Sequence, residues 1–171
     1  TRLYQFSGTA GSTIFLDNTN FTTTDPFGYT GYCSLYDSYG RLIGSWGLDV
    51  DSGRISLSET GTYTLVLQGD INAVSSPTNP STTFTVRSVT DTTTAMTLGT
   101  VVSSSIASVG QNNKYTFTLA TPTRLWFDSR TNNGNLNWLL TGPTGIVATP
   151  SAGAGATPFN HDDQYLDLLP A

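Results

Sequence analysis

The sequence predicts an all-β fold made of two tandem β-sandwich domains of jelly-roll-like type, both incomplete at the ends of the chain. Two observations lead to this prediction. Short segments alternate apolar and polar residues with a period of two, and a second set of such segments repeats the first in the same order. An alternation with one apolar face is the pattern of a half-buried strand. No window of the chain has the periodicity of an amphipathic helix.

The alternating segments follow one another along the 171 residues. The first begins at Tyr4 (YQFS), another contains Tyr63 (TYTLVLQ), and a third begins at Tyr115 (YTFTL). Clusters of Gly, Asn, Asp and Pro separate them, as at residues 8–11 and 75–80, and these residue types favour turns. Many short strands at this spacing are typical of a β-sandwich.

An internal repeat relates the two parts of the chain. YQFSGTAGSTIFLDN from Tyr4 aligns with YTFTLATPTRLWFDS from Tyr115 at an offset of 111 residues, and LDVDSGRISLSET aligns with FNHDDQYLDLLPA at the same offset. Between these blocks, SLYDSYGRLIG aligns with WLLTGPTGIVA, where Leu35 meets Leu140 at an offset of 105. The offset changes only in loops, as expected of two diverged copies of one fold.

The repeat sets the predicted domain boundaries. Residues 1–90 form the first copy, residues 91–97 a short polar linker, and residues 98–171 the second copy. In this alignment the first copy lacks its opening strand and the second copy lacks its closing strands. Two interpretations stay open: the chain is part of a longer protein, or neighbouring subunits supply the missing strands by donor-strand exchange.

The charge, hydropathy and cysteine content of the chain exclude several kinds of partner and site. Charged residues make up 11% of the chain, the net charge is −5 and the pI is about 4.4, so we expect no nucleic-acid partner. No apolar run approaches the roughly 20 residues of a membrane-spanning helix, so we expect no membrane span. A single cysteine, Cys33, excludes an intrachain disulfide and a cysteine-based metal site. The acidic, Thr-, Ser- and Gly-rich composition with one lysine is associated with secreted bacterial proteins and favours an extracellular or cell-surface location.

The sequence offers no convincing catalytic motif. The only histidine, His161, lies in a polar loop, and the first copy has Val50 at the aligned position. A nucleophilic serine between glycines, a phosphate-binding loop and a dinucleotide fingerprint are all missing. Glu59 is the only glutamate, so a carboxylate pair for glycoside cleavage would have to come from scattered aspartates. We therefore predict that the chain is not an enzyme.

Loop aspartates make calcium the candidate cofactor. Carboxylate oxygens in loops suit Ca²⁺, which takes roughly six to eight oxygen ligands. The alternative is that these aspartates make turns and cap strand ends. Recurrence in both copies keeps the calcium hypothesis open. The candidate ligands are Asp17, Asp49 and Asp51 in the first copy and Asp128, Asp162 and Asp163 in the second.

Aromatic residues form a second candidate site. Exposed Tyr and Trp rings can stack on sugar rings, whereas buried ones fill a core. The alignment of Trp126 with Phe15 favours a packing role for Trp126. The residues concerned are Tyr29, Tyr32, Tyr36, Tyr39 and Trp46 in the first copy and Trp126 and Trp138 in the second.

The order of the motifs resembles the bacterial pre-peptidase C-terminal (PPC) type of β-sandwich. The pattern is LGTxVSxSI, a loop with Asn or Asp, YTFTL, a short turn, LWFDS, an apolar strand with GPTG, an Asp-rich loop and TGTYTLVLQG. It covers nearly the whole chain in two partial copies and is most similar to the tandem copies of large secreted or cell-surface proteins. The resemblance implies a jelly-roll-like sandwich without catalysis, serving as a spacer, an adhesive module or an appendage of a secreted enzyme. Some related modules bind calcium.

These observations together predict a non-enzymatic, extracellular structural or adhesive repeat of a large bacterial surface or filament-forming protein, with sandwiches stacked end to end. Its partners would be neighbouring copies or adjacent repeats. The alternative is a non-catalytic appendage of a secreted hydrolase that binds polysaccharide or a cell-surface protein.

Overall fold

The computed structural model describes residues 1–22, 31–69, 81–131, 133, 135–148 and 164–170. Within these residues every regular element is a β-strand, so the predicted all-β fold is confirmed. The chain divides into two units: unit 1 contains residues 1–94 and 101–115, and unit 2 contains residues 95–100 and 116–171. No helix long and apolar enough to cross a membrane occurs in the described residues.

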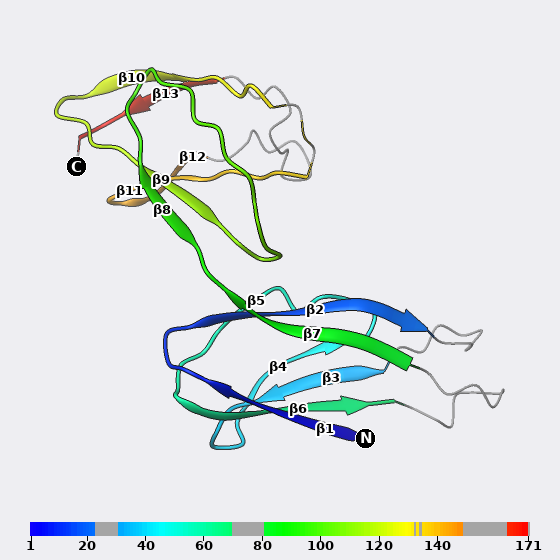
Figure 1. The fold of residues 1–171 in the computed structure, drawn as a ribbon. Helices are drawn as coiled ribbons and strands as arrows, with labels where there is room; N and C mark the ends of the chain where they lie inside the picture. Colours follow the sequence, from blue (N-terminus) through cyan, green and yellow to red (C-terminus); the bar gives the residue numbers. More distant parts are fainter. Residues whose placement is uncertain (23–30, 70–80, 132, 134, 149–163, 171) are drawn as a thin grey trace. The chain divides into compact units, whose positions relative to one another are not determined.

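Unit 1 is a sandwich of two antiparallel sheets (Figure 1). One sheet has the strand order β1-β6-β3-β4 and the other has the order β5-β2-β7. The strands of unit 1 are β1 (Arg2–Gly8), β2 (Thr13–Thr22), β3 (Tyr32–Tyr36), β4 (Leu42–Gly47), β5 (Arg54–Ser56), β6 (Gly61–Gln68) and β7 (Ser81–Val89).

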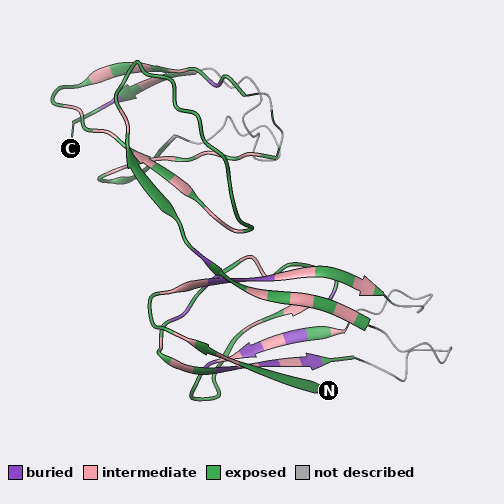
Figure 2. Cartoon of the chain, in the orientation of Figure 1, coloured by how far each residue is buried: buried purple, intermediate pink, exposed green. Residues whose placement is uncertain are grey.

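The core of unit 1 lies between the two sheets. Alternate residues of β3 and β6 point into it, as their alternating sequences predict, and Figure 2 shows these buried positions. Tyr63 is fully buried, stacks on Phe6 at 5.6 Å between ring centroids, and donates its hydroxyl to the carbonyl of Glu59 at 2.8 Å. Cys33 is also buried, and burial raises the pKa of its thiol to about 11, so the thiol is inert at neutral pH.

A single carboxylate organises the turn between β3 and β4. Asp37 accepts the backbone N–H of Tyr39 at 2.9 Å and both the backbone N–H and the Nε–H of Arg41, at 2.8 and 2.6 Å. Burial alone would raise the pKa of Asp37, but these hydrogen bonds outweigh it and hold the pKa below its usual value. Gly40 takes a φ of 79° in this turn, which glycine adopts without strain.

Strands β8 (Thr92–Ala95) and β9 (Asn113–Thr116) pair with each other where the chain passes from unit 1 to unit 2. Strand β8 lies inside the predicted linker 91–97. Residues 101–115, predicted as part of the second copy, cluster with unit 1 because side chains of β2 and β5 hold part of this segment, as shown below.

Unit 2 contains two strand pairs in its described part. Strand β10 (Thr123–Phe127) pairs with β13 (Gln164–Leu168), and β11 (Leu140–Gly142) pairs with β12 (Gly145–Ala148), both antiparallel. Phe127 of β10 stacks on Trp138, with ring centroids 4.4 Å apart.

The same strand register occurs in both units. In unit 1, β2 and β5 place Ile14 opposite Ile55, and in unit 2, β10 and β13 place Leu125 opposite Leu166. Both members of the second pair lie 111 residues after those of the first. The neighbouring pair Phe15 and Arg54 corresponds in the same way to Trp126 and Tyr165. A one-residue slip would turn every side chain to the other face, so this agreement supports the aligned repeat.

Candidate functional site

Two of the predicted calcium ligands already have protein partners. Asp17 on β2 accepts a hydrogen bond from Arg87 Nε on β7 at 2.6 Å. Asp51 accepts the backbone N–H of Asn18 at 2.8 Å, which fastens the loop before β5 to strand β2. These contacts match the alternative reading, in which loop aspartates hold backbone and strand ends.

The other four predicted calcium ligands are either exposed or outside the described residues. Asp49 and Asp128 are exposed, and Asp162 and Asp163 lie outside the described residues. In the described part of the chain, no group of three or more His, Cys, Asp or Glu side chains is close enough to hold a metal ion. The calcium site therefore stays a prediction.

Thermal unfolding tests the calcium prediction directly. An ion that binds only the folded chain stabilises it by RT ln(1 + c/Kd), where c is the concentration of free ion, so the melting temperature rises with that concentration. The prediction requires a higher melting temperature in calcium than in a chelator, and a smaller rise in the Asp51→Asn variant. The same melting temperature under both conditions would remove calcium from consideration.

The aromatic residues predicted in the first copy have different roles. Trp46 packs against the core, whereas Tyr39 is exposed at the β3–β4 turn with the Arg41 guanidinium 5.3 Å from its ring centre. Tyr32 is exposed at the start of β3 and Tyr36 is half-buried at its end. Tyr29 lies outside the described residues.

In the described part of unit 2, two exposed aromatic residues lie side by side on β10 and β13. Trp126 is 51% exposed and Tyr165 is 70% exposed, and their ring centroids are 4.4 Å apart with the planes inclined at 60°. The prediction that Trp126 packs in the core is wrong, because the alternation of β10 turns Leu125 and Phe127 inward and Trp126 outward. We call the outward side chains Arg124, Trp126, Tyr165 and Asp167 the Trp126 face.

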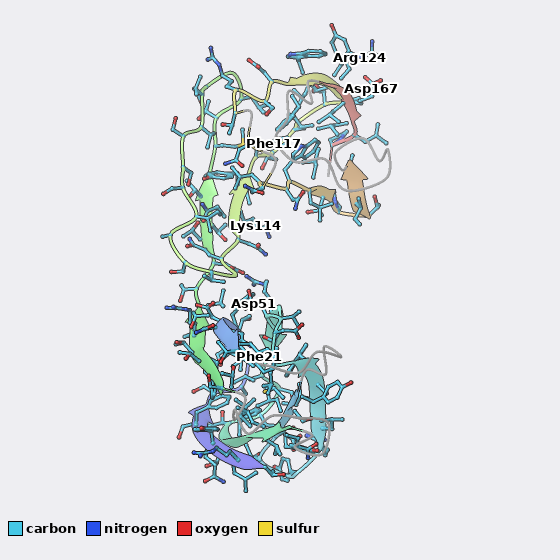
Figure 3. All side chains as sticks on the ribbon, turned by 90° about the vertical axis from the view of Figure 1, so that its right-hand side faces the viewer. Phe21, Asp51, Lys114, Phe117, Arg124 and Asp167 are labelled. Carbon is cyan, nitrogen blue, oxygen red and sulfur yellow. The ribbon has the colours of Figure 1, made fainter. Side chains whose placement is uncertain are left out.

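An ion pair borders the two rings. Arg124 binds Asp167 through two hydrogen bonds, Nε to Oδ1 at 2.6 Å and Nη2 to Oδ2 at 2.8 Å (Figure 3). The pair holds the pKa of Asp167 below its usual value, and the guanidinium also lies 6.0 Å from the Tyr165 ring centre. An open hollow of about 230 Å³ adjoins this pair and is lined by Pro122, Thr123, Arg124, Asp167, Leu168 and Leu169.

The aligned surface of unit 1 is covered by the chain itself. Phe15 points away from the core between Ile14 and Leu16, yet all three residues are buried. A Cβ atom added to Gly110 would lie 2.7 Å from the Phe15 ring, so the turn at residues 108–111 rests on that ring. Beside it, Arg54 donates to the carbonyl of Gly110.

Arg54 also binds the residue that precedes β8. Its Nη1 and Nη2 donate to the two carboxylate oxygens of Asp91 at 2.8 and 2.6 Å. Asp91 in turn accepts the backbone N–H of Asn112 at 2.9 Å. We call Arg54, Asp91, Gly110 and Asn112 the Arg54 clamp. The sequence analysis did not predict the clamp. The sequence features that could have indicated it are Arg54 on the short strand β5, Asp91 before β8 and Gly110 before β9.

The clamp predicts a pH dependence. The hydrogen bonds from Arg54, and then that from Asn112, lower the pKa of Asp91 from 3.8 to about 2. A carboxyl group whose pKa is depressed stabilises the folded state above its unfolded pKa and loses that contribution as the pH falls through the folded pKa. We expect the protection factors of the amides at residues 108–112, which are corrected for the intrinsic pH dependence of hydrogen exchange, to fall between about pH 4 and pH 2.

The Asp91→Asn variant is the control for this prediction. It should show low protection factors at these amides already at pH 6, with little further decrease on acidification. An Asp91 carboxyl that titrates in NMR spectra at its ordinary pKa would contradict the clamp.

Comparison of the chain with protein-family models, with curated proteins and with solved structures gave no match. The resemblance to PPC-type sandwiches therefore stays a prediction.

Proposed function

We propose that this chain is a non-enzymatic structural repeat of a large extracellular bacterial protein, and that its β-sandwiches stack end to end in a surface layer, stalk or filament. The observation that carries the proposal is the identical strand register at a spacing of 111 residues, Ile14 opposite Ile55 and Leu125 opposite Leu166. Repeated sandwich units joined in one chain are suited to spacing and display, which need no catalytic residue.

The Arg54 clamp supports this proposal. Asp91 follows the last strand of the first copy, and Gly110 and Asn112 come just before β9, the first aligned strand of the second copy. Side chains of β2 and β5 thus hold the segment through which the first copy leads into the second. The low charge and the Thr- and Ser-rich composition support an extracellular setting.

Scattering from chains of increasing length tests the stacking. Polypeptides that repeat the 111-residue period once, twice and three times are compared by small-angle X-ray scattering. We expect the maximum dimension to increase by a constant step with each added repeat. A dimension that grows only as the cube root of the mass would contradict a stacked array.

A carbohydrate-binding appendage of a secreted hydrolase is the second candidate, and the Trp126 face favours it. Exposed aromatic rings beside an arginine and an aspartate can stack on a sugar ring and bind its hydroxyl groups. Affinity electrophoresis in gels that contain soluble polysaccharides tests this function. Retardation of the natural chain that is lost in Trp126→Ala would support it, and equal migration of both chains in every gel would dismiss it.

A further inference from the structure

We propose that the Trp126 face is the docking surface for the glycine turn of an adjoining repeat, a turn of the type formed by residues 108–111 and accompanied by an acidic residue equivalent to Asp91. This proposal rests on the proposed stacking of repeats. It identifies the Trp126 face as the surface of the second copy that contacts the next repeat. Its occupant is protein of this same repeat, and neither a sugar nor an unrelated partner is required.

The outward surfaces of the β2–β5 and β10–β13 strand pairs are equivalent. Because the register of β2 with β5 is the register of β10 with β13, Trp126 and Tyr165 occupy the positions of Phe15 and Arg54. Side chains at equivalent positions of equivalent strands point to the same side of their sheet. The Trp126 face is therefore the second copy's version of the surface that carries the turn in unit 1.

The aromatic residues at the two equivalent positions differ in burial. Phe15 is only 9% exposed because the turn at Gly110 covers it, whereas Trp126 is 51% exposed. Trp126 is a large exposed aromatic residue at the position where Phe15 is covered by the turn. This indicates that Trp126 is covered by a similar turn when its partner is present. The ring that remains open is also the larger of the two.

The turn at residues 108–111 is held in shape by its own hydrogen bonds. The turn is closed by a hydrogen bond from Gln111 N–H to the Ser108 carbonyl at 3.1 Å. The Gln111 side chain accepts the backbone N–H groups of Ala107 and Ser108 at 3.0 and 3.2 Å. The turn is thus organised by its own residues and presents Gly110, which has no side chain, to the aromatic ring. A preorganised turn loses little entropy when it docks.

The residues at positions 54 and 165 can both donate hydrogen bonds to a docked turn. In unit 1 Arg54 donates to the turn carbonyl and to Asp91. At the equivalent position Tyr165 has a hydroxyl that can donate to the same types of acceptor. The two rings of the Trp126 face are inclined at 60°, so they do not form one flat platform for consecutive sugar rings.

To test this proposal, the chain is extended by a segment that contains the glycine turn and the equivalent of Asp91. Leu168 is the counterpart of Leu57, so the chain is continued from Leu168 with a second copy of residues 58–115. The added residues contain no tryptophan, which leaves Trp46, Trp126 and Trp138 as the only fluorophores of their kind. The Trp126→Phe form of each chain is measured in parallel, and the difference isolates the signal of Trp126.

We expect Trp126 to lose most of its quenching by acrylamide in the extended chain and its emission to shift to shorter wavelength. The matched control carries valine in place of the added copy of Gly110 and should keep the quenching of the 171-residue chain. A Tyr165→Arg variant of the extended chain rebuilds the full clamp and should raise the melting temperature. Quenching that is unchanged by the extension would overturn the inference, and if the scattering still shows a linear array, the proposed function survives.

A second measurement uses the natural chain and does not depend on folding of the extended one. The 171-residue protein is titrated with a synthetic peptide of residues 104–113, and the indole N–H of Trp126 is followed by NMR. We expect a shift that saturates, and no shift with the peptide that has valine at position 110. A Trp126 signal that responds to a soluble polysaccharide and not to the peptide would overturn the inference in favour of sugar binding.

Discussion

The Leu35→Ala variant loses about 2–5 kcal/mol of the free energy of unfolding of unit 1. Leu35 is 1% exposed on β3 and lies opposite Leu65 of β6, in the middle of the inner surface of the four-stranded sheet. Removing its isobutyl group loses the transfer free energy of those atoms and leaves a cavity that the two sheets cannot close. Urea denaturation followed by circular dichroism and by the fluorescence of Trp46, which packs against this core, measures the loss.

Leu42→Ala is the matched control for Leu35→Ala. Leu42 lies on the neighbouring strand β4 and is 58% exposed, so its truncation should change the stability by no more than about 0.5 kcal/mol. Equal losses in the two variants would mean that the core does not lie between the sheets as described.

The strand pattern of the sequence predicts the sheets well because burial within a sandwich is a local property. Alternation alone places Tyr63, Leu65 and Leu67 inward, and all three are buried. The repeat alignment matches Ile14 with Leu125 and Ile55 with Leu166, and these residues pair across their strands in the same register.

The candidate site was harder to predict because its contacts join residues far apart in the sequence. Arg54 reaches residues 37 and 56 positions away, and no local periodicity records such a contact. Trp126 illustrates the same limit. Its aligned partner Phe15 is buried, but by a turn from residues 108–111 and not by its own sandwich core. The alignment of the two copies therefore cannot predict that Trp126 is buried from the burial of Phe15.

The Gly110→Ala variant is the most direct test of how the turn rests on the first sandwich, and we expect it to lose about 2–4 kcal/mol of stability. Gly110 has a φ of 78°, a conformation in which a side chain is strained, and its added Cβ would lie 2.7 Å from the Phe15 ring. Gly99 separates the two effects. It also takes the third position of a hydrogen-bonded turn, with a φ of 81°, but no atom lies within 4 Å of its added Cβ. Gly99→Ala should therefore lose only the backbone contribution, about 1 kcal/mol.

A double-mutant cycle assigns the remaining loss to the aromatic ring. With Phe15→Ala as the background, the added methyl group at position 110 meets no ring, and the effect of Gly110→Ala should fall to that of Gly99→Ala. Urea denaturation of the four proteins of the cycle gives the coupling free energy, which we expect to be about 1–3 kcal/mol. A coupling near zero would mean that the turn and the Phe15 ring do not support each other. The Trp126 face is identified as a docking surface by its equivalence to Phe15 and Arg54. Without a stabilising contact between the turn and Phe15, unit 1 would no longer support that docking.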